Sequence, residues 1–352
     1  MTAVHQALSG AGSVDAVTGQ ALMVQRLLRE WGHEGGVFAD AIDPRIADRV
    51  KPLVDFQPGP DDVLLVRYSA YAPKLRPLVE WPQRKLLVYH NVTPAKYLWN
   101  HHPGVAVACS LGRDQLPVWA RAASVATADS EFNAAELRAA GAAEVRSVPI
   151  LFDPAPLAER GTSPSSGDGP LVLAVGRLTP NKRHDLVLAA FALYQRECAP
   201  DARLLCVGPG LSPQYERLVT AEVERSGARN VVLAGSVPQA DLNAAYAEAD
   251  VLLSMSEHEG FCVPLLEAFH FALPVVARPA GAMPEVGGDA VVWDHDDDLA
   301  VTAELIDLAV RDDELRATAS ERGRAQLERF SLDRSEAALR EAVEATLASR
   351  RS

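Results

Sequence analysis

The chain reads ADVLLSMSEHEGFCVPLLEAF from Ala249 to Phe269: an apolar run, a glycine-containing turn and a second apolar run. The first run is typical of a buried parallel strand, and the second, continued to Phe271, is typical of a buried helix. Gly260 allows close approach of the backbone to a ligand, and Pro264 suits a first helical turn, where no N–H is needed. Free amides in such a turn attract anions and hydroxyl groups. The stretch therefore predicts a parallel α/β sheet with a ligand-binding turn at a strand end.

Two glutamates, Glu259 and Glu267, bracket this turn. Glu267 falls inside the apolar run from Val263 to Phe269, where an ionised carboxylate is costly unless it has a partner. The alternative is that both are solvated charges, one on a loop and one on a helix. Their spacing resembles the E-x7-E signature of the retaining glycosyltransferases of family 4. That resemblance implies the GT-B fold, in which two Rossmann-like domains face each other across an interdomain cleft.

Strand-like and helix-like segments alternate on both sides of a Gly/Ser/Pro-rich segment, residues 161–170, which is typical of a linker or a long loop. The expected strands before it are 62–66, 85–89 and 123–128, and those after it are 171–175, 203–207, 230–234 and 250–254. We therefore predict two parallel-sheet α/β domains, 1–152 and 170–330. The resemblance implies that the first is the acceptor-side domain and the second binds the nucleotide-sugar donor. The C-terminal helix expected within 331–352 would rejoin the first domain or else lie on the second.

A second group of charges follows the strand expected at Leu171–Val175, where Gly176 and Arg177 precede Lys182. Two cations at the carboxyl end of a strand suit a diphosphate, because Arg offers a planar fork of donors and Lys a compact charge. The alternative is ordinary surface charge, which fits Arg183. The pattern is similar to the G-R-x(4)-K of family 4. The similarity implies that Arg177 and Lys182 neutralise the departing nucleoside diphosphate.

The resemblance also implies the remaining donor contacts. Glu267 would hold the ribose hydroxyls, Glu259 the hydroxyls of the transferred sugar, and backbone groups near Val237 the base. The amides of the turn, and a glycine loop within residues 8–16, would approach the sugar and phosphate oxygens: Gly260, Phe261, Cys262, Val263 and Gly12. Ordinary turn chemistry explains the loop glycines equally well.

Two strand ends supply the first-domain candidates. The segment Tyr89-His90-Asn91 resembles the catalytic-cleft histidine loop of the family, which implies that His90 contacts the transferred sugar and that Asn91 lies on the acceptor side. Ser130 resembles a serine-bearing turn on the same side. The structural alternatives stay open, since a lone histidine is more often structural and a serine before an apolar periodic segment predicts a helix N-cap.

Composition and motifs exclude other function classes. A net charge of -13 argues against a nucleic-acid groove, and the dinucleotide fingerprint that begins at Gly10 fails at Asp15. Adjacent His101 and His102 do not face one side of a helix, and no D-x-D motif stands near them, so we expect no metal and no other cofactor. The four cysteines lack CxxC spacing and are expected to be reduced thiols.

No apolar run approaches the roughly 18 residues of a membrane span, and the N-terminus lacks a signal core. We expect a cytoplasmic protein without stable membrane insertion, and a peripheral contact with the inner face of the membrane stays open.

The resemblance to family 4 implies a retaining hexosyltransferase that moves a hexose from a UDP- or GDP-sugar to a hydroxyl acceptor: a glycan, a lipid-linked sugar or a small metabolite. The alternatives are a GT-B sugar-nucleotide epimerase, a GT-B phosphorylase and a non-catalytic nucleotide-sugar-binding protein. Attack on the face of the leaving group and a covalent intermediate both remain open.

Overall fold

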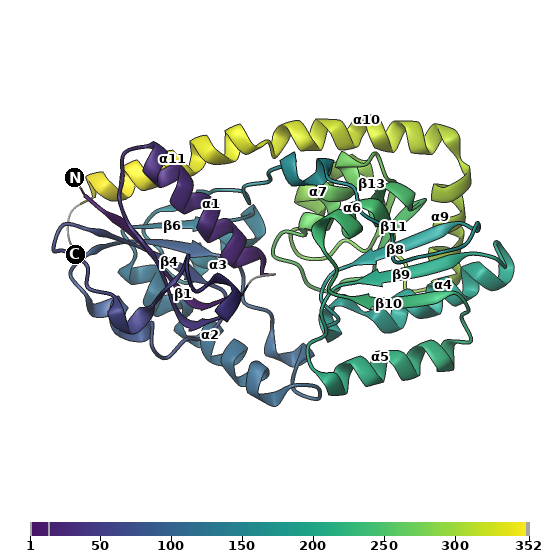
Figure 1. Cartoon of the computed structure of the whole chain (residues 1–352), viewed down its shortest axis with the longest axis horizontal. Coiled ribbons are helices and arrows are strands. Elements are labelled where there is room, and N and C mark those ends of the chain that lie inside the picture. The colour runs from purple at the N-terminus through teal and green to yellow at the C-terminus, as the bar shows by residue number, and fades with distance from the viewer. Residues whose placement is uncertain (1, 13–14, 350–352) are drawn as a thin grey trace. The chain divides into compact units, whose positions relative to one another are not determined.

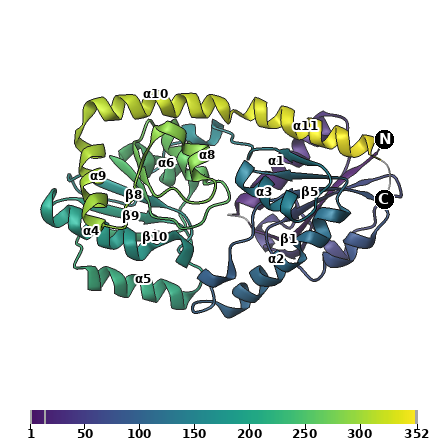
Figure 2. The ribbon, with the colours of Figure 1, turned by 180° about the vertical axis from the view of Figure 1, so that it is seen from behind.

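The computed structural model describes residues 2–12 and 15–349, and this chain divides into two compact units. Unit 1 holds the chain up to Trp99, Pro103–Leu151 and the chain from Leu332 on, whereas unit 2 holds Asn100–His102 and Phe152–Ser331. Each unit has one parallel sheet flanked by helices (Figures 1 and 2). The predicted pair of parallel-sheet α/β domains is therefore confirmed.

The described part of unit 1 forms a seven-stranded parallel sheet in the order β3-β2-β1-β4-β5-β6-β7. The order reverses between β1 and β4, and ligands of open α/β sheets bind outside the carboxyl ends at such a switch point. The strands are β1 Val4–Ala11, β2 Val37–Ile42, β3 Lys51–Pro52, β4 Val63–Tyr68, β5 Arg84–Tyr89, β6 Val125–Ala128 and β7 Val145–Ser147. The α-helices are α1 Ala16–Glu30, α2 Pro103–Ala122, α3 Glu131–Ala139 and α11 Leu332–Ala348, with short 3-10 turns at Pro44–Ile46, Leu53–Asp55, Arg76–Glu80 and Ala95–Tyr97.

The last helix of the chain completes the core of unit 1. Leu339 and Val343 of α11 are buried in one apolar cluster with Val24 and Leu27 of α1 and with Leu65 of β4. Figure 1 shows α11, in yellow, running beside α1. Full burial of a side chain of this size contributes roughly 1.5–3 kcal/mol. Helix α11 is therefore part of the fold of unit 1, although 180 residues of unit 2, Phe152–Ser331, precede it in the sequence.

Unit 2, all of whose residues are described, has a six-stranded parallel sheet in the order β10-β9-β8-β11-β12-β13. Its switch point lies between β8 and β11. The strands are β8 Leu171–Val175, β9 Arg203–Val207, β10 Val231–Gly235, β11 Val251–Ser254, β12 Val275–Ala277 and β13 Val291–Trp293. The α-helices are α4 His184–Glu197, α5 Pro213–Ser226, α6 Gln239–Glu248, α7 Val263–His270, α8 Met283–Gly287, α9 Leu299–Arg311 and α10 Asp313–Arg329, with 3-10 turns at Ala155–Ala158, Pro180–Lys182 and Gly288–Ala290.

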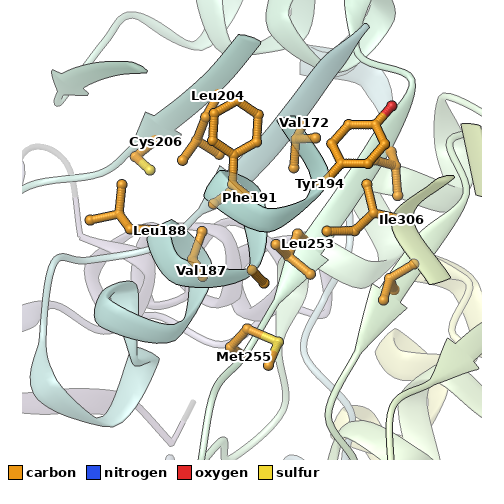
Figure 3. Packing of buried hydrophobic residues seen from close by; sticks show 14 of the residues in the cluster. Val172, Val187, Leu188, Phe191, Tyr194, Leu204, Cys206, Leu253, Met255 and Ile306 are labelled. Carbon is orange, nitrogen blue, oxygen red and sulfur yellow. The ribbon is translucent and has the colours of Figure 1, made fainter. Parts of the chain in front are cut away.

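One face of this sheet packs against α4, α5 and α9. Phe191 and Tyr194 of α4 lie over Val172 and Leu204 of the sheet, and Ile306 of α9 closes the cluster (Figure 3). All five side chains are fully buried. This core fixes the positions of the strand ends that carry the loops of the candidate site.

The Gly/Ser/Pro-rich segment 161–170 is a long loop of unit 2 and does not connect the units, since the division falls between Leu151 and Phe152. Its Gly161 amide donates to the carbonyl of Ala240 at 2.9 Å. The four cysteines are all described, and each is a free thiol, as predicted. Among the described residues, no helix combines the length and the apolar composition needed to cross a bilayer.

Candidate functional site

Two loops meet at the switch point of unit 2, one after β8 and one after β11. The amide of Glu257 donates to the carbonyl of Asn181 at 2.8 Å, and the Asn181 side-chain amide donates back to the carbonyl of His258 at 3.2 Å. Asn181 is buried, and sequence reasoning had given it no role. These paired bonds fix the register of the two loops, and with it the position of the residues that follow.

The register brings Lys182 and Glu259 together in an ion pair between the Lys182 Nζ and the Glu259 Oε1. Their side chains are only 18% and 10% exposed. Burial acts to lower the pKa of Lys182, but the adjacent Glu259 carboxylate outweighs it and the pKa is raised. Arg177 is exposed, and its charge acts on Lys182 in the opposite direction to that of Glu259. The two loops thus gather two cations and one carboxylate at the carboxyl ends of the neighbouring strands β8 and β11.

Arg183, which fits ordinary surface charge by its sequence, bonds to both Asp185 and Glu257. Its backbone is in the left-handed region, with φ of 53°. A residue other than glycine adopts this conformation only where its surroundings enforce it. In addition to the two hydrogen bonds of Asn181, the Arg183–Glu257 ion pair is a third link between the loops after β8 and β11.

The turn between β11 and α7 has the predicted strand-turn-helix form. Helix α7 begins at Val263, with Pro264 in its first turn. Cys262 precedes the helix in the left-handed region, with φ of 79° and ψ of 69°, which the sequence did not predict. Phe261 and Cys262 are buried, whereas Gly260 and Val263 are partly exposed.

Glu267 has the partner that its apolar surroundings require. The Tyr246 hydroxyl, on α6, donates to Oε2 of Glu267 at 2.7 Å. Burial raises the pKa of Glu267, and the Tyr246 hydrogen bond acts to lower it. Tyr246 is itself buried and stacks on Phe271, with ring centroids 5.5 Å apart. Tyr246 therefore orients one oxygen of the carboxylate.

Close backbone packing supports the loop that carries Glu259. The amide of Ala282 donates to the Glu259 carbonyl at 3.0 Å. A Cβ on the neighbouring Gly281 would lie 2.2 Å from the same oxygen, and Gly281 has φ of +57°. Only glycine fits there without displacing Glu259. Val237 follows β10 and is partly exposed, at the same edge of the sheet.

The site candidates of unit 1 lie at the carboxyl ends of β5 and β6. His90 follows β5, and its Nδ1 lies 2.9 Å from Oδ2 of Asp129, which follows β6. Its Nε2 lies 3.0 Å from a guanidinium nitrogen of Arg67, a residue of β4. The His90 side chain is 8% exposed. Sequence reasoning identified His90 but neither of its partners.

The other unit 1 candidates have structural partners. The Asn91 side-chain amide, on a buried residue, donates to Oδ1 of Asn133 at 2.7 Å, and the Ser130 hydroxyl caps α3 by accepting from the Asn133 amide at 3.2 Å. The Gly12 amide donates to the Thr18 hydroxyl at 3.0 Å. An acceptor role for Asn91 and Ser130, and a phosphate role for Gly12, stay predictions. The predicted glycine loop also includes Ser13 and Val14, which lie outside the described residues.

Comparison with known families bears on unit 2. Residues 158–326 match the family described as Glycosyl transferases group 1. This group 1 region contains the Arg177, Lys182, Glu259 and Glu267 side chains described above.

Curated relatives carry the same kind of name. The chain is 33% identical over 162 residues to O-antigen chain mannosyltransferase B of Escherichia coli, covering 45% of this chain and 42% of that protein. It is 38% identical over 139 residues to the D-inositol 3-phosphate glycosyltransferase of Segniliparus rotundus, covering 38% and 29%. A GDP-mannose-dependent alpha-(1-6)-phosphatidylinositol monomannoside mannosyltransferase of Mycolicibacterium smegmatis is 33% identical over 152 residues, covering 40% and 39%. The matches thus span less than half the length of these relatives.

Solved structures match over nearly the whole chain. The Anabaena protein HepE in complex with UDP and glucose has a TM-score of 0.75 at 18% identity, covering 97% of this chain and 100% of that one. Sucrose-phosphate synthase of Thermosynechococcus elongatus has a TM-score of 0.78 at 16% identity, covering 99% and 100%. At these identities the likeness is one of fold, and it agrees with the predicted GT-B class.

Proposed function

We propose that this chain is a retaining hexosyltransferase, which moves a hexose from a nucleoside-diphosphate sugar to a hydroxyl acceptor. The observation that carries the proposal is the largely buried Lys182–Glu259 pair at the switch point of unit 2, inside the region that matches group 1. Ligands of open α/β sheets bind at that edge. A cation and a carboxylate held there side by side suit a ligand that has both phosphate oxygens and sugar hydroxyls.

Arg177 and Lys182 are the proposed diphosphate clamp. Negative charge grows on the diphosphate as the glycosidic bond breaks, so cations fixed at that point stabilise the transition state more than the bound donor. A phosphate oxygen would share the Lys182 ammonium with Glu259. The carboxylate of Glu259 would then accept hydrogen bonds from the sugar hydroxyls, as the resemblance to family 4 implies.

Glu267 is the proposed ribose contact. Tyr246 donates to its Oε2, and the hydroxyls of a ribose would donate to the remaining acceptor positions of the carboxylate. A partly buried carboxylate with one oxygen already oriented loses little freedom on binding. The amides from Gly260 to Val263 and backbone groups near Val237 complete the proposed donor site.

For unit 1 we propose the acceptor side of the reaction, with His90 as the residue that contacts the transferred sugar. We also propose that the cationic clamp makes a metal ion unnecessary. The acceptor classes are a glycan, a lipid-linked sugar and a small metabolite, encountered in the cytoplasm, where a lipid-linked acceptor would be met at the inner face of the membrane.

A thermal-shift panel tests the donor proposal. UDP, GDP and ADP, with UDP-glucose and GDP-mannose, would be compared, because only a ligand that binds the native state raises apparent stability. The names of two relatives and of HepE, which include GDP-mannose, mannosyltransferase and UDP with glucose, direct the choice of sugars. A shift with one nucleoside diphosphate that is lost in Glu267→Ala supports the assignment. No shift with any of them contradicts it.

Product analysis then separates the enzyme classes. The proposed transferase yields a glycoside that keeps the anomeric configuration of the donor, detectable by proton NMR. An epimerase would change the sugar with no acceptor present, and a non-catalytic binder would leave the donor intact. A glycoside of inverted configuration would leave the transferase class standing and refute the retaining assignment.

A further inference from the structure

A row of buried polar side chains crosses the sheet of unit 1, from the first half of β1 to the carboxyl ends of β4, β5 and β6. Gln6 is on β1, Arg67 on β4, His90 directly after β5 and Asp129 directly after β6. Gln6 is 1% exposed, Arg67 3% and Asp129 5%. Polar groups buried to this degree need hydrogen-bond partners. In this row each finds its partner on a neighbouring strand or strand end.

The contacts run continuously from one residue to the next. Gln6 Nε2 donates to the carbonyl of Ala21 at 2.7 Å, and Gln6 Oε1 accepts from Nε of Arg67 at 3.0 Å. A terminal nitrogen of Arg67, Nη1, lies 3.0 Å from Nε2 of His90. On the far side of the ring, Nδ1 of His90 lies 2.9 Å from Oδ2 of Asp129.

These partners determine which nitrogen of His90 carries the hydrogen. A guanidinium has five N–H donors and no acceptor, so Nε2 of His90 must accept from Arg67 through its lone pair. The carboxylate of Asp129 is an acceptor, so Nδ1 carries the hydrogen and donates it. A hydrogen on Nε2 would point at an N–H of Arg67. The tautomer thus follows from the two neighbours of the ring.

Arg67 keeps its charge in this position. Burial lowers the pKa of Arg67 to about 10, while the carboxylates of Asp129 and Asp15 act to raise it. At neutral pH the guanidinium is therefore still protonated and available as a donor. The charges that act on the row are those of Arg67, Asp129 and Asp15, which lies at the N-terminus of α1.

We propose that Arg67 is a positioning residue, which together with Asp129 holds His90 as the neutral Nδ1–H tautomer with a fixed ring orientation. The catalytic meaning of this inference rests on the proposed transferase function. In that reaction His90 would contact the sugar without giving up or taking a proton, because its one hydrogen is bound to Asp129 and its lone pair is bound to Arg67. Stabilisation of the departing diphosphate would then depend on cations and not on proton transfer from His90.

Nitrogen-15 NMR of the full chain labelled at histidine tests the tautomer directly. The His90 signals are identified by their loss in His90→Gln. We expect a protonated Nδ1 and a bare Nε2 at neutral pH. Arg67→Met should raise the population that carries a hydrogen on Nε2, since no N–H of Arg67 then points at that nitrogen, while Nδ1 keeps its hydrogen on Asp129. A hydrogen on Nε2 in the unsubstituted protein overturns the proposal without any variant.

Arg203→Met is the matched control. Arg203 is also a buried strand arginine, on β9 of unit 2, where it bonds to Glu248 and to the carbonyl of Gly169. Its loss should lower stability and leave the His90 signals unchanged. If Arg67→Met does not fold, Arg67→Lys replaces it, because a single ammonium cannot span Gln6 and His90 as a planar guanidinium does. An Nε2 that stays bare in the folded Arg67 variant, as in the unsubstituted protein, refutes the positioning role.

Turnover separates this inference from the proposed function. We expect Arg67→Lys to lower kcat at least tenfold while the KM for the nucleotide sugar stays the same. A protein that turns over no nucleotide sugar would refute the transferase and leave the NMR result to decide the tautomer. Full kcat in Arg67→Lys, with the tautomer disturbed, would show that the orientation of His90 has no part in the reaction.

Discussion

The substitution Gly281→Ala should displace Glu259 and so lower both turnover and stability, and a second glycine variant separates the two effects. The added Cβ would lie 2.2 Å from the Glu259 carbonyl oxygen and 3.0 Å from its nitrogen, whereas ordinary contact begins near 3.4 Å. The backbone of Glu259 must therefore recede by about 1 Å, and displacements of that size at a reacting group can cost about 10²-fold in rate. The left-handed backbone adds about 1–2 kcal/mol of destabilisation.

Gly227→Ala isolates the backbone contribution. Gly227 follows α5 in the same unit with φ of +71°, and nothing lies within 4 Å of a Cβ placed there. Both variants would be compared by urea unfolding at constant slope and by turnover of the nucleotide sugar that the thermal-shift panel identifies. Gly227→Ala should lose stability alone, and Gly281→Ala should lose more stability and about 10²-fold in turnover. Equal stability losses with full turnover in Gly281→Ala would refute the link between this packing and the position of Glu259.

Three further predictions concern charges of unit 2. Arg177→Ala and Lys182→Ala should each lower turnover more than donor affinity. Lys182→Ala should also lower the urea midpoint of unfolding, because it leaves the buried Glu259 carboxylate unpaired. Turnover that survives both substitutions contradicts the proposed diphosphate clamp. Because burial raises the pKa of Glu267, its protonated form favours folding: this contribution is complete below the unfolded pKa of 4.5 and is lost as pH rises through the folded value. Glu267→Gln should therefore gain stability over the unsubstituted protein as pH rises to 7 while losing donor affinity, and a gain that shrinks with rising pH would contradict this. Burial lowers the pKa of His184 from 6.5 to about 4, so the neutral side chain contributes to the free energy of unfolding above pH 6.5, and this contribution is lost toward pH 4. His184→Phe should therefore reduce the fall in the free energy of unfolding over that interval by up to about 3 kcal/mol. An unchanged fall, measured by urea titration, would rule the assignment out.

Local sequence patterns were sufficient to predict the strand, turn and helix around Gly260. The apolar runs, the glycine and Pro264 are all close in sequence, and β11 and α7 form where the pattern places them. The need of Glu267 for a partner was also predictable, since it depends only on its apolar neighbours. The identity of that partner was not, because Tyr246 lies on another helix and reaches Glu267 only through tertiary packing.

Other residue pairs that are distant in sequence could not be predicted either, for the same reason. Lys182 and Glu259 are 77 positions apart, and their contact depends on the order of strands in the sheet. Arg67 was overlooked for a different reason: the expected strand ended at residue 66, yet β4 continues to Tyr68 with Arg67 buried. A charge inside an apolar strand is a sign of a buried polar partner, and this sign was available in the sequence. The roles of the individual site residues stay predictions, since they depend on bound ligands.

The position of α11 determines the order in which a growing chain can mature. Ribosomes deliver residues from the N-terminus, and domains generally fold as units when their residues have emerged. Unit 1 lacks Leu339 and Val343 from its core until the last helix is made, whereas unit 2 has all of its residues by Ser331. Unit 1 is therefore completed after unit 2, although most of its residues are made earlier. Until α11 has emerged, the apolar surface formed by Val24 and Leu27 stays uncovered by this helix, so the nascent unit 1 is the part that depends on protection against aggregation.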